Sequence, residues 1–133
     1  MISQYFFPEN FRINDLCLGL KERGHHISVL TAKPNYPEGK FFNGYNFFNK
    51  SSEKYNGIKI YRSLIIPRGK GSGFRLFINY ISFVIFGVVR ILFISDKFDK
   101  IFVYAPSPIT VGYIGILASI KFRAKAFLWV HDL

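Results

Sequence analysis

The chain has 133 residues, of which 50% are hydrophobic and 19% are aromatic, so it suits one globular domain and not a disordered chain. Lysine and arginine number 18 against 8 aspartates and glutamates, and the formal net charge of +10 favours an anionic partner: a nucleotide diphosphate, a lipid diphosphate, an anionic membrane surface or nucleic acid. The single cysteine, Cys17, excludes an intrachain disulfide and a metal site built from several cysteines.

The first predicted elements are a helix, a strand and a long loop. Residues 12–23 have apolar side chains at helical spacing, and Gly24 follows as a natural end of the helix. Residues 26–31 are β-prone and predict a strand. Residues 32–57 hold proline, glycine, asparagine and aromatic residues, which indicates a long loop. Residues 58–62 alternate between apolar and polar side chains and predict a half-buried strand.

The second half begins with a glycine-rich loop over residues 67–73, for which a flexible linker is favoured over a phosphate cradle because the P-loop spacing is absent. A long apolar helix over 74–94 and a buried strand over 101–104 follow. A helix over 110–122 precedes the last predicted strand, 126–130. This order predicts an α/β fold in which helices cover a parallel sheet, in a single domain over residues 1–133.

The helix at 74–94 raises the question of a membrane. Its longest stretch without charge, residues 76–89, has 14 residues, whereas a spanning helix needs about 20 apolar residues. We expect a core helix, with an interfacial helix and a true span as alternatives. No secretory signal is expected, because the first five residues lack a basic segment and an apolar run.

A basic stretch surrounds this helix and favours contact with an anionic membrane surface. Seven lysines and arginines follow Glu53 with no acidic residue before Asp96: Lys54, Lys59, Arg62, Arg68, Lys70, Arg75 and Arg90. Basic side chains beside an apolar surface are typical of peripheral membrane proteins, and a solvated face is the alternative. We expect no nucleic-acid partner, because no helix-turn-helix, RNA-recognition or zinc-finger pattern accompanies the charge.

Two segments are candidates for ligand binding. Pro8, Glu9, Asn10 and Arg12 lie between the start of the chain and the first helix, and ligands of open α/β sheets bind where strands end and helices begin. The alternative is an ordinary turn in which Asn10 caps the helix. No G-x-G-x-x-G dinucleotide fingerprint is present.

The second candidate is His131, with Asp132 beside it. His131 directly follows the last apolar strand, at the edge where α/β active sites form. An imidazole there can act as a base or donate a hydrogen bond to a hydroxyl or phosphate.

Several segments in this order resemble family 4 glycosyltransferases. The resemblance rests on QYFFPE at 4–9 and LKERGHHISVLT at 20–31. PNYPEG at 34–39, the turn Ser107-Pro108 and WVHDL at 129–133 resemble the subgroup that makes colanic acid, O-antigen and capsule. Together these motifs cover nearly all of the chain.

The resemblance implies a GT-B fold of two Rossmann-like domains, with the acceptor held by the N-terminal domain and the nucleotide sugar held by the C-terminal domain. It implies retaining transfer without a metal or another cofactor. By position, His131 matches the histidine that approaches the donor sugar and is the expected catalytic residue. Pro8, Glu9 and Asn10 match the loop near the sugar and diphosphate.

The expected substrate-binding residues are Pro8, Glu9 and Asn10, together with Arg12 and Asp132, which are included because of their positions in the sequence. The chain is then expected to be the N-terminal part of a glycosyltransferase, a fragment that lacks the donor domain and is inactive alone. It would move sugar from a nucleotide sugar to a lipid-linked saccharide during surface polysaccharide synthesis, at the inner face of the bacterial plasma membrane. The alternatives are a non-catalytic membrane-surface module that partners a separate donor-domain chain and a small integral membrane protein.

Overall fold

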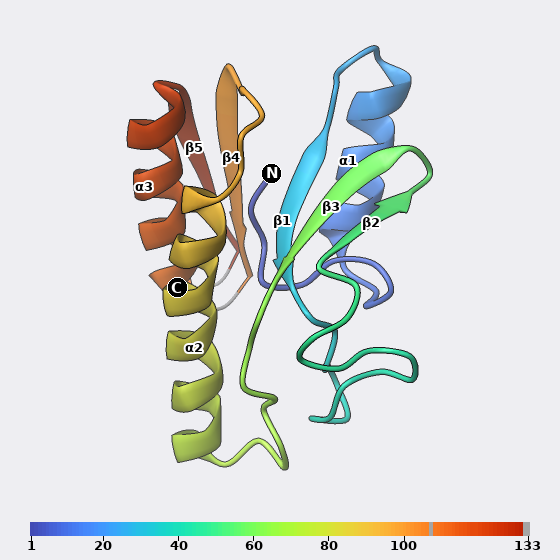
Figure 1. The fold of residues 1–133 in the computed structure, drawn as a ribbon, viewed down its shortest axis with the longest axis vertical. Helices are drawn as coiled ribbons and strands as arrows, with labels where there is room; N and C mark the ends of the chain where they lie inside the picture. Colours follow the sequence, from blue (N-terminus) through green and yellow to red (C-terminus); the bar gives the residue numbers. More distant parts are fainter. Residues whose placement is uncertain (107, 132–133) are drawn as a thin grey trace.

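A computed structural model describes residues 1–106 and 108–131, which form a mixed α/β fold (Figure 1). A 3₁₀ turn at Ile109–Val111 leads into the last helix. In chain order, the helices and strands are α1 (Arg12–Glu22), β1 (Ser28–Ala32), β2 (Ser52–Tyr55), β3 (Ile58–Ser63), α2 (Gly73–Leu92), β4 (Lys100–Ala105), α3 (Gly112–Phe122) and β5 (Lys125–Val130).

Two groups of strands meet at the N-terminus. β1 pairs in parallel with β3, β4 pairs in parallel with β5, and β2 lies antiparallel to β3. Ile2 forms parallel bridges to Leu30 of β1 and to Val103 of β4, so the start of the chain lies between these two strands (Figure 1). The prediction of parallel pairing is confirmed within each group, but the strands form two small sheets, one with the antiparallel edge strand β2, and not a single parallel sheet.

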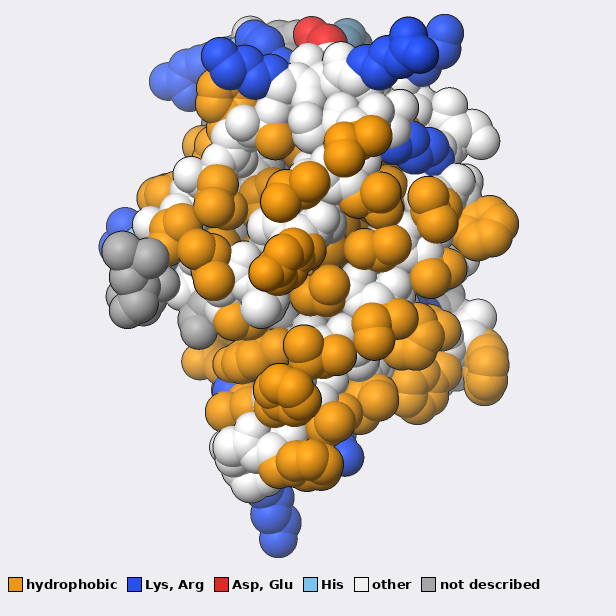
Figure 2. Space-filling model, turned by 90° about the vertical axis from the view of Figure 1, so that its left-hand side faces the viewer, with side chains coloured by type: hydrophobic (Ala, Val, Ile, Leu, Met, Phe, Trp, Pro, Cys, Tyr) orange, Lys and Arg blue, Asp and Glu red, His pale blue; other side chains and the backbone are white. Residues whose placement is uncertain are grey.

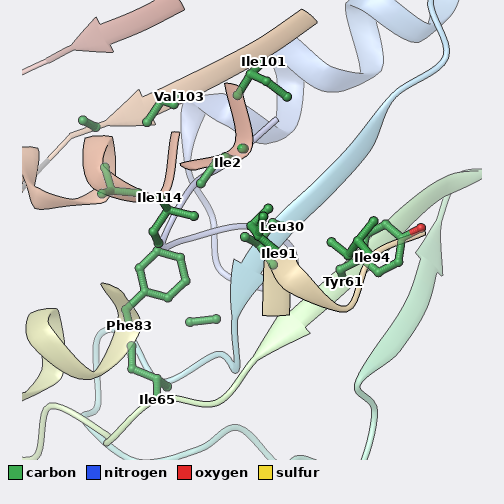
Figure 3. Close-up of a cluster of buried hydrophobic side chains, with 14 of the residues drawn as sticks. Ile2, Leu30, Tyr61, Ile65, Phe83, Ile91, Ile94, Ile101, Val103 and Ile114 are labelled. Carbon is green, nitrogen blue, oxygen red and sulfur yellow. The ribbon is translucent and has the colours of Figure 1, made fainter. Parts of the chain in front are cut away.

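The helices cover opposite faces of these strands. α1 lies on one side, and α2 and α3 lie together on the other (Figure 1). Ile13 and Cys17 of α1 pack in one buried cluster with Val29 and Ile60. The cluster on the other side joins α2 and α3 to the sheet, and Figure 3 shows Ile2 among side chains from strands on both sides of it.

One strand was not expected. β2 lies inside the segment that was expected to be a long loop. It was not predicted, because its residues Ser52 and Lys54 are exposed and polar and give no apolar alternation. The informative signal is the turn that follows it: Asn56 and Gly57 have φ values of 49° and 80°, and Asn-Gly is a preferred two-residue hairpin turn. The hairpin also removes β3 from the edge of the sheet, so β3 is mostly buried instead of half-buried.

The alternative in which Asn10 caps α1 needs correction. The N-cap of α1 is Phe11 and no side chain caps the helix, so Asn10 does not cap it. Asn14 instead donates to the Glu9 carbonyl oxygen at 2.8 Å. β5 is paired as predicted, but its first four residues are exposed.

Close packing of α3 on β4 depends on Gly115. A Cβ atom at Gly115 would lie 2.4 Å from Cγ2 of Val103, a stiff β-branched side chain in the core. We expect Gly115→Val to lower the free energy of unfolding by about 1–3 kcal/mol through overpacking. Urea unfolding measures the change.

Gly112→Ala is the matched control, because nothing lies within 4 Å of a Cβ atom there and the backbone is helical. Its expected effect is neutral or stabilising by up to about 1 kcal/mol. Equal stability of the Gly115→Val protein and wild type would contradict the packing of α3 described here.

Candidate functional site

The candidate site lies where the parallel strands end. Because the N-terminal segment runs parallel to β1 and β4, and these run parallel to β3 and β5, the segments that follow all of these strands leave at the same end of the fold. The loop after the N-terminal segment, the loop after β1 and residue 131 therefore share this end. It is the end where α/β proteins bind ligands.

Glu9 is buried at this end and ties two loops together. Its carboxylate oxygen Oε2 accepts hydrogen bonds from the backbone N–H groups of Tyr36 at 2.8 Å and Asn35 at 3.1 Å. Its other oxygen, Oε1, is buried without a hydrogen-bond partner among the described residues. Burial raises the pKa of Glu9 to about 7, although the backbone hydrogen bonds from Tyr36 and Asn35 oppose the shift.

A polar network continues from Glu9 into the core. Asn35 accepts from the backbone N–H of Arg68 at 3.1 Å, and Asn79 of α2 donates to the Ile66 carbonyl oxygen at 2.7 Å. Gln4 donates to the Asn79 side chain at 2.8 Å. These contacts join the start of the chain, the loop after β1 and α2, so the loops at this end have a defined arrangement.

The glycine-rich loop is part of this arrangement. The backbone N–H of Gly69 donates to the Gly39 carbonyl oxygen at 2.9 Å. Gly39 has a φ of 80°, and a Cβ atom there would lie 1.7 Å from the Gly69 oxygen. The expected linker is therefore packed against the loop after β1.

His131 lies beside Tyr104 of β4, and the charge of Arg12 acts on the pKa of the same tyrosine. The exposed His131 ring lies 6.2 Å from the Tyr104 ring and 6.0 Å from the Trp129 ring, measured between centroids. Its backbone N–H donates to the Ala105 carbonyl oxygen at 3.1 Å, which continues the β4–β5 ladder. Burial raises the pKa of Tyr104, and the positive charge of Arg12 opposes this rise.

The other predicted residues have different surroundings. Pro8 lines a cavity of about 530 Å³ with Phe7 and Tyr45. Asn10 is exposed. The structure thus places His131 beside Tyr104, leaves Arg12 exposed at the start of α1, and directs Glu9 and Pro8 toward the loop after β1. Asp132, and Ser107 of the Ser-Pro turn, lie outside the described residues.

Arg62 is a functional candidate that the sequence indicated only as part of a basic surface. It is 2% exposed, pairs with Glu53 through Nε, and donates to the carbonyl oxygens of Ala32 at 3.0 Å and Phe7 at 2.6 Å. Because β2 brings Glu53 beside β3, the longest basic side chain of β3 is buried and paired. The expected continuous basic face is therefore interrupted at Arg62.

An extended apolar surface lies on α2, α3 and β5. Figure 2 shows hydrophobic side chains across the face formed by α2 and α3, with lysines and arginines at its two ends. Exposed residues of this face, which we call the apolar face, are Phe74, Phe77, Ile85, Val89, Leu92, Tyr113, Ile116 and Ile120. A groove of about 320 Å³ continues it between α3 and β5.

α2 is long and apolar enough to cross a membrane by length and composition, with a mean hydropathy of 1.8. Only 28% of that stretch is buried, so α2 does not have the surroundings of an enclosed core helix.

Comparisons of the chain with protein-family models, with curated proteins and with solved structures found no match. Residues 1–106 and 108–131 contain no cluster of three histidine, cysteine, aspartate or glutamate side chains that could hold a metal ion.

Glu9 predicts a pH dependence of stability. Its pKa is raised from 4.5 to about 7 in the folded protein, so between these values the folded state binds more protons than the unfolded state and stability falls as pH rises. Relative to Glu9→Gln, the wild type should lose up to about 3 kcal/mol between pH 4.5 and pH 8. Urea unfolding of both proteins across this range measures the difference.

Glu38→Gln serves as the control, because it removes the same charge from an exposed side chain in the loop after β1. Parallel stability profiles of wild type and Glu9→Gln would show that Glu9 is not buried as described.

Proposed function

We propose that the chain is the acceptor-side, N-terminal part of a retaining glycosyltransferase, with a Rossmann-like GT-B domain architecture. The resemblance of its motifs to family 4 glycosyltransferases supports this function. The observation that carries it is the position of His131, exposed directly after β5 at the ligand-binding end of parallel strands and beside Tyr104.

The proposed reaction assigns distinct roles to the site residues. The bond between the donor sugar and the nucleoside diphosphate breaks, and a bond from the sugar to an acceptor hydroxyl oxygen forms. The proton of that hydroxyl passes to an oxygen of the departing diphosphate. His131 stabilises the donor sugar in the transition state, and the exposed guanidinium of Arg12 offsets negative charge on the phosphates. Glu9 positions the loop at Asn35 and Tyr36 through two backbone hydrogen bonds.

A lipid-linked saccharide acceptor requires a membrane surface, and we assign that contact to the apolar face. Phe77 and Ile85 of α2 are 59% and 55% exposed, and Ile116 of α3 is 58% exposed. Burial of such side chains in the interfacial layer contributes apolar free energy, and lysines and arginines at the ends of the face add attraction to anionic lipids. The same face supports the second candidate function, a non-catalytic membrane-surface module that binds a separate donor-domain chain.

Transfer activity is the test of the enzymatic function. The chain is co-expressed with a candidate donor-domain protein and incubated with labelled nucleotide sugars and membranes that contain lipid-linked acceptors. We expect labelled lipid-linked product, and we expect His131→Ala to lower turnover by roughly 10²-fold or more with little change in KM, because the lost contact acts in the transition state.

His25→Ala is the control, since His25 is an exposed histidine at the junction of α1 and β1. Unchanged turnover of His131→Ala would remove His131 from catalysis. Membrane binding without transfer of any sugar would favour the non-catalytic module.

Co-sedimentation with lipid vesicles tests whether the apolar face contacts membranes. The double variant Phe77→Ser/Ile85→Ser should co-sediment less with vesicles that contain anionic lipid, since it removes two exposed apolar side chains from α2. Phe48→Ser is the control, because Phe48 is 96% exposed in the loop before β2 and outside the apolar face. Wild-type binding should weaken with salt. Equal binding of wild type and the double variant would exclude the apolar face as the contact surface.

A further inference from the structure

Lys33 is a buried ammonium group without an acceptor. It follows β1 directly and is 1% exposed, and its Nζ has no hydrogen-bond partner among the described residues. A buried charge without a partner is unfavourable, and surrounding residues normally provide one. Burial lowers the pKa of Lys33, the charges of Arg62 and Lys50 lower it further, and Glu53 opposes them.

Glu53, the carboxylate that opposes the lowering of the Lys33 pKa, already has other hydrogen-bond partners. Glu53 accepts a hydrogen bond from Nε of Arg62. It also accepts from the Tyr45 hydroxyl, whose oxygen lies 3.0 Å from Oε1 and 3.1 Å from Oε2. Lys33, Lys50, Glu53 and Arg62, which we call the Lys33 cluster, therefore contain three basic groups and one acid. The cluster has an excess of positive charge at the ligand-binding end of the strands.

Two residues that line the cavity of about 530 Å³ beside Pro8, namely Tyr45 and Phe7, contact the cluster. The ring centroid of Tyr45 lies 4.4 Å from Nζ of Lys50 and 5.1 Å from Cζ of Arg62. Phe7, which also lines the cavity, accepts from Arg62 through its carbonyl oxygen. Lys40 and Glu38 add one basic and one acidic side chain to the lining, so the excess of positive charge comes from the cluster.

We propose that the Lys33 cluster and this cavity form a binding site for a phosphate-bearing ligand, whose phosphate oxygens supply the acceptor that Lys33 lacks. An ammonium group on a flexible four-carbon chain offers three donors and suits phosphate. Because Nζ is covered in this structure and Lys33 does not line the cavity, binding requires the Lys33 side chain to turn toward it. Arg62 stays in place through its three contacts, and the exposed Lys50 supplies a second ammonium group.

The excess of positive charge suits a phosphate monoester or a diphosphate. This inference does not depend on the proposed glycosyl transfer, because it rests on the charges and the cavity and is tested by binding alone.

Binding of inorganic pyrophosphate to the whole chain is the test, measured by calorimetry and by thermal unfolding. Wild type should bind and unfold at a higher temperature with pyrophosphate. Lys33→Met should unfold at a higher temperature than wild type without ligand, because a buried unpaired charge is removed, yet bind pyrophosphate roughly tenfold or more weakly. A merely structural lysine would not produce these two opposite effects.

Two further variants complete the test. Lys54→Met makes the same charge change at an exposed position of β2 and should retain wild-type affinity for pyrophosphate. Lys50→Met changes an exposed residue of the cluster, so it tests the site even if Lys33→Met does not fold, and it should weaken binding. Absence of binding to wild type, or equal losses of affinity in Lys54→Met and in the cluster variants, would overturn the proposal.

The source of the phosphate is distinguished by two further probes. Tighter binding of geranyl diphosphate than of uridine diphosphate would assign the site to a lipid diphosphate, and the reverse order would assign it to a nucleotide. Equal binding of both and of pyrophosphate, with loss in Lys33→Met, would support a site that recognises the diphosphate alone.

Discussion

The pairing of Ile2 with two strands is the constraint on which the rest of the structure depends. Its backbone N–H donates to the Phe102 carbonyl oxygen at 2.8 Å, and its carbonyl oxygen accepts from Tyr104 at 2.9 Å. On the other side, the N–H of Ser3 donates to the Leu30 carbonyl oxygen at 3.0 Å. Without this segment, the β1–β3–β2 group and the β4–β5 group would share no strand pairing.

This joint also determines where the polar groups meet. Because the segment continues directly into Glu9 and α1, the loop before α1 lies beside the loop after β1 and near the ends of β4 and β5. Glu9 and Lys33 are then buried at one end of the fold with opposite shifts of pKa, each toward its neutral form. Buried ionisable groups with perturbed pKa values are characteristic of functional sites.

Local pattern predicted much of the fold, because apolar periodicity and helix-ending residues are local properties. The helices at α1 and α2 and the buried strand β4 follow from such patterns, with ends that differ by one or two residues. β2 could not be read from its own polar residues, and the Asn56-Gly57 turn was the signal that could have identified it. The first strand is reduced to a bridge at Ile2, a short segment in which periodicity cannot be detected.

The candidate site was predictable only where position along the chain determines position in the fold. His131 could be placed because a residue after a parallel strand lies at the ligand-binding end. The burial of Glu9 and Lys33 was not predictable, since it depends on the loop after β1 folding back over both. Arg62 was expected on a basic surface, and its burial depends on Glu53, which an unexpected strand brings beside it.

Residue-resolved amide hydrogen exchange tests the central claim, that the N-terminal segment joins the two groups of strands into one cooperative unit. We expect the amides of Ile2, Ser3 and Tyr104 to exchange as slowly as those in the middle of β1 and β3, through global unfolding. Exchange of Ile2 and Tyr104 that is orders of magnitude faster than that of β1 and β3 would contradict it, since the two groups of strands would then open separately.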